Sequence, residues 1–267
     1  MLGVELSRLF TRPRTWLTIT LLAGLPVIVG IFLRTTGVGP RPGQGPALLT
    51  DVLSNGTLFP AAALALILPI FLPVATAVVA GDTIAGEANA GTLRYLLVRP
   101  VSRAWLLFSK LVTVVVFVFL AVLVVAGIGF VAGAVLFGLE PVTSVSGSTL
   151  STTDIVMRTI LTIAYVGVSM LGLASIAVLA STRTDSPLAA ALAALATFVT
   201  SQVLDLIDAA RVIRPYLPTH YWLSFVDLFR DPILWHNLGR GFALQAVYIV
   251  VFLGLAWASF STKDITS

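Results

Sequence analysis

The sequence contains no cysteine, and charged residues fill only 10% of its 267 positions. Without cysteine, a disulfide framework and any metal site built on thiolates are excluded. The charged fraction is well below the roughly 25% of an ordinary soluble domain, whereas 58% of the residues are hydrophobic. A soluble chain of this length could not bury so much apolar surface in one core, so the composition predicts a protein surrounded by lipid.

The sequence also lacks the patterns of catalytic, metal and nucleic-acid sites. His220 and His236 are the only histidines, which is too few for a convergent metal site. Gly167-x-Ser169 lacks the full nucleophile-elbow pattern, and the basic residues are scattered along the chain. No G-x-x-x-x-G-K-S/T phosphate loop occurs. We therefore expect no catalytic residue, no metal ligand, no nucleic-acid surface and no ATP hydrolysis in this chain.

Six uncharged stretches are each long enough to cross about 30 Å of hydrocarbon as a helix. The first holds 19 residues, which is longer than the apolar region of a signal peptide, and no cleavage motif follows it. We therefore expect an all-α membrane protein in which 1–267 forms one transmembrane domain. The six predicted spans lie at 15–33, 58–80, within 111–139, and at 159–182, 186–204 and 241–262.

Two patterns inside the spans concern helix packing. Pro60, Pro69 and Pro73 predict a bend in the second span, and either a hinge or a static bend would account for them. In the third span, Gly129-x-x-x-Gly133 is the spacing of small residues that lets two helices approach closely.

Two segments outside the spans have the composition of membrane-boundary structure. Residues 1–12 place Leu2, Leu6, Leu9 and Phe10 on one helical face, which predicts an amphipathic helix at the interface. The segment at about 205–240 interleaves charge with aromatic side chains, which favours short re-entrant helices at the outer leaflet. Its candidate functional residues are Asp205, Pro218, His220, Tyr221 and Trp222, although Asp205 could equally be a wetted span end.

The basic residues before the first span predict the orientation. Arg8, Arg12 and Arg14 precede it, and positive charge beside the first span favours a cytoplasmic N-terminus. Six spans return the C-terminus to the same side. We therefore expect a multi-pass protein of the cell membrane with both termini in the cytoplasm.

The inner loop 81–110 is the most informative segment. Leu93, Leu96 and Leu97 form an apolar helical face. Pro100 disfavours helix at the residue before it, and Ser102 can cap a new helix that runs into the third span. The pattern predicts a short cytoplasmic helix, a break, and a helix that enters the membrane, which suits docking onto a soluble partner.

This loop carries a family pattern of thirteen positions: Gly81, Asp82, Glu87, Gly91, Thr92, Leu93, Leu96, Leu97, Pro100, Val101, Ser102, Arg103 and Lys110. The pattern resembles the permease subunits of ABC-2-type ABC transporters, which are type V exporter-like transmembrane proteins. The ending Phe260-x-x-Lys263-Asp264-Ile265 is similar to that of many such permeases.

The resemblance implies a role for each segment. The loop would be the coupling helix that meets separate ATPase subunits, 1–12 the connecting helix, and 205–240 the outer re-entrant helices. A second permease copy or a related permease would complete the pathway, and ATP with Mg would bind only to the partner ATPase. The implied coupling residues are Asp82, Glu87, Gly91, Thr92, Leu93, Arg94, Leu97, Pro100, Ser102 and Arg103.

Other interpretations of these residues stay open. Asp82 and Glu87 could pair with the ATPase, brace the loop, or be ordinary solvated carboxylates. Arg94, Arg99 and Arg103 could dock the partner or contact lipid headgroups. At the level of the whole chain, the alternatives to an ATP-driven exporter of unknown substrate are a stand-alone secondary transporter or channel and a membrane-embedded enzyme.

Overall fold

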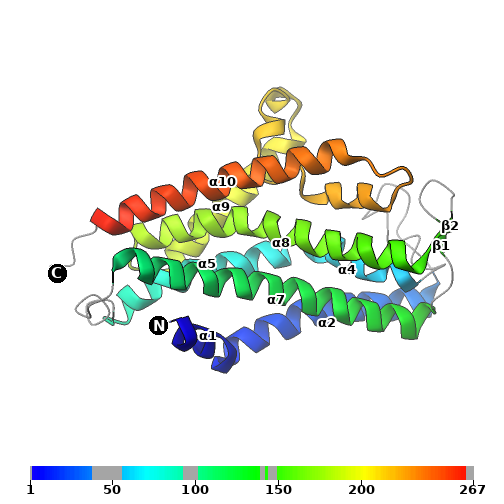
Figure 1. The fold of residues 1–267 in the computed structure, drawn as a ribbon, viewed down its shortest axis with the longest axis horizontal. Coiled ribbons are helices and arrows are strands. Elements are labelled where there is room, and N and C mark those ends of the chain that lie inside the picture. Colours follow the sequence, from blue (N-terminus) through cyan, green and yellow to red (C-terminus); the bar gives the residue numbers. More distant parts are fainter. Residues whose placement is uncertain (1, 38–55, 93–101, 139–141, 144–148, 263–267) are drawn as a thin grey trace.

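The computed structural model describes residues 2–37, 56–92, 102–138, 142–143 and 149–262 as an elongated bundle of helices (Figure 1). Six of its helices are long and apolar enough to cross a membrane, which confirms the predicted number of spans. The described residues therefore form a helical, multi-pass membrane protein. Its one small antiparallel pair of described strands consists of β1 (Val142–Thr143) and β2 (Thr149–Leu150).

The remaining elements follow one another in a simple order along the chain. Three of them, η2 to η4, are 3-10 helices between the last two spans. The elements are α1 (Leu2–Thr11), α2 (Pro13–Thr36), η1 (Gly56–Leu58), α4 (Phe59–Ile67), α5 (Phe71–Asn89), α7 (Arg103–Phe137), α8 (Thr152–Arg183), α9 (Pro187–Leu206), η2 (Asp208–Ala210), η3 (Arg214–Tyr216), η4 (Trp222–Phe229) and α10 (Trp235–Thr262).

Local sequence sets where the helices begin. Ser102 accepts a hydrogen bond from the Trp105 amide at 3.3 Å, which confirms the predicted cap of α7. Ser151 and Asp154 form a reciprocal capping box at α8, and Ser186 caps α9 just before Pro187. Each cap satisfies amides that the first turn of a helix leaves without an intrahelical partner.

The second predicted span needs a correction. The expected continuous helix at 58–80 is divided into α4 and α5, and Pro69 lies in the turn between them. Pro60 and Pro73 lie in the first turns of α4 and α5, where a missing amide costs little. The helix α5 then continues to Asn89, past the two acidic residues at which an uncharged window stops.

The same charge effect explains why three other helices are longer than their uncharged spans. The helix α7 begins at Arg103, as the predicted cap at Ser102 requires, and its first turns contain Arg103 and Lys110 ahead of the uncharged span. At about 1.5 Å per residue, its 35 residues extend over about 52 Å, well beyond the hydrocarbon layer. The helices α8 and α10 likewise begin ahead of their uncharged cores.

The bundle has two distinct ends (Figure 1). One end carries α1, the end of α5, the start of α7, the α8–α9 turn and the last turn of α10, and we call it the terminal end. The opposite end carries β1, β2 and η4. Both described chain ends therefore lie at the same end of the bundle, as an even number of crossings requires.

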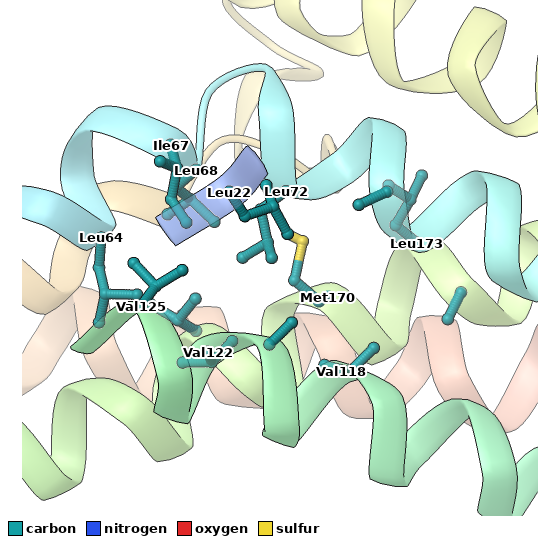
Figure 2. Close-up of a cluster of buried hydrophobic side chains, with 14 of the residues drawn as sticks. Leu22, Leu64, Ile67, Leu68, Leu72, Val118, Val122, Val125, Met170 and Leu173 are labelled. Carbon is teal, nitrogen blue, oxygen red and sulfur yellow. The ribbon is translucent and has the colours of Figure 1, made fainter. Parts of the chain in front are cut away.

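The α4–α5 break is embedded in the apolar core. Leu64, Ile67, Leu68 and Leu72 around the break are fully buried, and Figure 2 shows them facing valines of α7. Met170 of α8 extends toward Leu72 from beside these valines. The break is therefore held between two neighbouring helices by close apolar packing.

The two glycines of the third span pack against the start of α4. A Cβ on Gly129 would lie 3.1 Å from the Pro60 Cα, and one on Gly133 would lie 2.2 Å from the Gly56 carbonyl oxygen. This contact confirms that Gly129-x-x-x-Gly133 marks a close helix–helix approach.

Gly133→Ala should destabilise the protein by about 1–3 kcal/mol, because its Cβ overpacks a backbone contact. Gly127→Ala on the same helix is the matched control, since a Cβ there meets nothing within 4 Å. Helix propensity predicts that this control is neutral or stabilising by up to about 1 kcal/mol. Thermal unfolding in detergent micelles measures both, and equal midpoints for the two variants would contradict the packing.

Candidate functional site

A buried ionic cluster joins three helices at the terminal end. It consists of Glu5 and Arg8 of α1, Glu87 of α5 and Lys110 of α7, and we call it the terminal cluster. Lys110 Nζ lies 2.9 Å from Glu87 Oε1 and 3.1 Å from Glu5 Oε1. Arg8 Nη1 donates to Glu87 Oε1 at 3.2 Å.

The burial of the cluster makes these contacts consequential. The Lys110 side chain is 7% exposed and that of Glu87 is 10% exposed, whereas Arg8 is about half exposed. Two acidic and two basic side chains balance each other formally. Charges removed from water to this extent are tolerated only when they are paired and hydrogen-bonded. The cluster therefore fixes α1 and the start of α7 against the end of α5.

The end of α5 is shaped to hold Glu87 in this position. The chain turns at Gly91, whose φ of 65° lies in the left-handed region that favours glycine. The Thr92 amide then donates back to the Glu87 carbonyl at 3.0 Å, and the Thr92 hydroxyl donates to the Glu87 carboxylate. Gly91 and Thr92 of the family pattern thus have a local structural role in closing this helix end.

Asp82 lies more than one turn earlier on α5, and its carboxylate also pairs with basic side chains of the same protein. Arg12 Nη1 donates to its Oδ2 at 3.3 Å, and Arg14 Nη1 lies 3.8 Å from the same atom. Of the interpretations left open by the sequence, the contacts of Asp82 and Glu87 match bracing of the loop within the chain.

A serine of α8 inserts into the hydrogen-bond ladder of α5. Ser181 Oγ donates to the Gly81 carbonyl at 2.7 Å and accepts from the Ile84 and Ala85 amides at 3.0 and 2.8 Å. Insertion of a side chain into the ladder is a recognised cause of local helix distortion. Sequence patterns do not indicate this contact, because a serine near a helix end has many ordinary roles.

Arg103 ties the start of α7 to the end of α10. Its Nη1 donates to the Ser261 carbonyl at 2.9 Å and to the Phe260 carbonyl at 3.3 Å. A cation at this position satisfies carbonyls that the last helical turn leaves open and complements the helix dipole.

The terminal end thus brings together six of the ten residues that the resemblance assigns to coupling. Leu93, Arg94, Leu97 and Pro100 lie outside the described residues. The described six are Asp82, Glu87, Gly91, Thr92, Ser102 and Arg103.

The segment between α9 and α10 consists of short 3-10 helices, as the sequence predicted in outline. Three of its aromatic residues differ from the expected boundary position, because Tyr221, Trp222 and Phe225 are buried in the bundle, whereas Tyr216 and Trp235 are exposed. Trp222 stacks on Phe198 of α9, with ring centroids 5.5 Å apart. Burial against α8, α9 and α10 takes these rings out of contact with lipid.

Polar side chains of the bundle hold this segment by its backbone. Tyr165 of α8 donates to the Tyr221 carbonyl at 2.6 Å, and Gln245 of α10 donates to the Pro218 carbonyl at 2.7 Å. His220 Nδ1 lies 2.6 Å from Asp205 Oδ1, which links the turn to the end of α9. Tyr165 and Gln245 were missed in the sequence because their partners are backbone atoms far along the chain.

Within the part of the chain that the structure describes, no three His, Cys, Asp or Glu side chains are grouped as a metal site would require. The charged residues of the terminal cluster pair acid with base, and Tyr165 and Gln245 donate to backbone carbonyls. The geometry therefore suits mechanical connection between helices.

Fold and site together define a multi-pass helical membrane protein whose ionic cluster lies at one end of its bundle. Residues 51–266 match a family described as a protein of unknown function (DUF2705), and the chain belongs to this family. A search of curated proteins found no match.

Replacing Lys110 with Met should cost about 3 kcal/mol, because it leaves Glu5 and Glu87 facing each other without their shared cation. Arg14→Gln is the matched control, since it removes an exposed cation 3.8 Å from Asp82 and should cost less than about 1 kcal/mol. Chemical unfolding in micelles measures both. A Lys110→Met protein as stable as the control would show that the cluster contributes no net stability.

Tyr165→Phe should loosen the turn before η4 by about 1–2 kcal/mol, because the buried Tyr221 carbonyl loses its donor. Tyr216→Phe, on an exposed tyrosine of the same segment, should leave the turn unchanged. Hydrogen exchange of the amides at 217–222 measures the difference. The anchoring role fails if both variants exchange at the wild-type rate.

Proposed function

We propose that this chain is the permease subunit of an ATP-driven ABC transporter of the ABC-2 type, acting as an exporter. The proposal begins from the resemblance carried by 81–110. In it, two permeases, identical or related, form the pathway in the cell membrane, and separate ATPase subunits bind ATP and Mg.

The observation that carries the proposal is the way both ends of the 93–101 loop are fastened. Before the loop, the terminal cluster joins α5 to α1 and α7, and Ser181 joins α5 to α8. After the loop, Arg103 joins α7 to α10. A force applied to the loop would therefore reach five helices through short, directed contacts, which suits rigid-body switching between two states.

The charges support the proposed orientation. Arg8, Arg12 and Arg14 all lie at the terminal end, beside the start of α2. Positive charge beside the first span favours the cytoplasmic face. In the proposal, the terminal end and both chain ends face the cytoplasm, where the ATPase subunits would dock.

A stand-alone secondary transporter is the second candidate. Such proteins use broken helices and buried ionisable residues, and the α4–α5 break and the terminal cluster offer one of each. Two observations favour the ABC proposal. The cluster lies at helix ends rather than at mid-membrane, and its charges pair with each other.

If the proposal is correct, the affinity-purified chain carries ATPase subunits that contain a G-x-x-x-x-G-K-S/T loop and hydrolyse ATP. Leu97→Asp places a charge on the apolar face predicted for Leu93, Leu96 and Leu97 and should remove most of the ATPase from the purified complex. Leu206→Asp is the matched control, because Leu206 is exposed at the far end of α9.

ATP hydrolysis and chain composition of the three preparations decide between the two candidates. Equal recovery of ATPase with Leu97→Asp and with wild type would show that the loop does not form the docking site. A wild-type preparation without ATPase, in which an ion gradient alone drives flux in vesicles, would establish the secondary transporter instead.

A further inference from the structure

A groove of about 370 Å³ runs between α8 and α9 from the terminal end toward the middle of the bundle. This volume lies within the range of roughly 300–1,000 Å³ that ligand pockets usually have. Its walls are Ile176, Leu179 and Ala180 of α8 and Ala189 and Ala193 of α9. The alanines of α9 project only a methyl group, which leaves the space between the helices open.

The groove is apolar along its length and polar at its ends. Thr197 lies at the inner end, and Thr184 with Arg183 lies at the mouth. From Ala189 to Thr197, a rise of about 1.5 Å per residue gives a length of about 12 Å along the helix. An apolar groove of this length suits a linear hydrocarbon chain.

Arg183 gives the mouth a positive charge. Its side chain is exposed, and no acidic side chain lines the groove. Asp185, two residues further on, makes an interaction of its own and does not line the groove. The guanidinium can therefore donate several hydrogen bonds to an anion at the mouth.

The position of the groove selects the kind of anion. Its mouth lies where α8 ends and α9 begins, at the terminal end of two membrane-spanning helices (Figure 1). Headgroups lie at this level of a bilayer, while acyl chains lie along the apolar walls. A basic pocket between membrane helices at this level can hold an anionic lipid headgroup.

We propose that the α8–α9 groove binds one anionic phospholipid, with an acyl chain between the helices and the phosphate on Arg183. This assignment does not depend on the transport function proposed above. It requires only that the six helices span a bilayer.

The experiment is native mass spectrometry of the full chain in micelles, titrated with phosphatidylglycerol or with phosphatidylcholine of the same chains. Wild type should retain one phosphatidylglycerol and discriminate against phosphatidylcholine. Arg183→Gln removes the headgroup contact, and a single lost charge at this level should weaken binding by about fivefold. Ala193→Leu fills the groove and should weaken binding at least as much.

Matched controls separate the site from general effects. Ala196→Leu adds the same volume on an exposed position of α9 outside the groove, and Arg240→Gln removes an exposed arginine near the start of α10. Both should bind phosphatidylglycerol as wild type does. Thermal unfolding midpoints within about 2 °C of wild type for all four variants establish that binding, rather than folding, has changed.

Three results would overturn the assignment. Equal retention of the two lipids by wild type would show that the groove has no preference for an anionic headgroup. Unchanged binding by Ala193→Leu would show that no acyl chain lies in the groove. Full displacement of the lipid by water-soluble glycerol phosphate would show that the mouth binds a free phosphate group and that the apolar walls contribute nothing.

Discussion

Lys110 lies almost completely inside the protein between carboxylates from two other helices, and much of the terminal end depends on that arrangement. A buried ammonium is costly unless its donors are satisfied, and Glu5 and Glu87 satisfy it at 3.1 and 2.9 Å. Each carboxylate comes from a different element, so the pairing can form only when α1, α5 and α7 meet at one register. Apolar packing alone would fix this register only weakly, because dispersion and apolar burial have little directional preference. The ion pairs therefore set how the three helices lie along one another.

Other directed contacts connect further helices. Ser181 and Arg103 extend the terminal end to α8 and α10, while Tyr165 and Gln245, near the middle of α8 and α10, hold the segment before α10. The core around the α4–α5 break is apolar and closely packed. Paired charges gathered at one end of a bundle are a physical arrangement in which helices can tilt as rigid bodies about that end.

Several features followed from local sequence. The number of spans followed from hydropathy, because lipid requires about 20 apolar residues at every crossing regardless of what the rest of the chain does. The cap of α7 followed from Ser102, since capping involves residues a few positions apart. The exact extent of α5 did not follow, because charged residues inside a helix are indistinguishable from a loop until their partners are known.

The sequence by itself determined that this is a six-span helical membrane protein and pointed to 81–110 as its distinctive loop. Only the tertiary structure decided that Glu87 faces Lys110 rather than solvent, that Ser181 enters the ladder of α5, and that a groove opens beside Arg183. The physical reason is the separation along the chain of the residues that interact. Helix formation and membrane insertion depend on neighbouring residues, whereas a buried ion pair or a groove exists only where helices distant in the chain cross at a particular register.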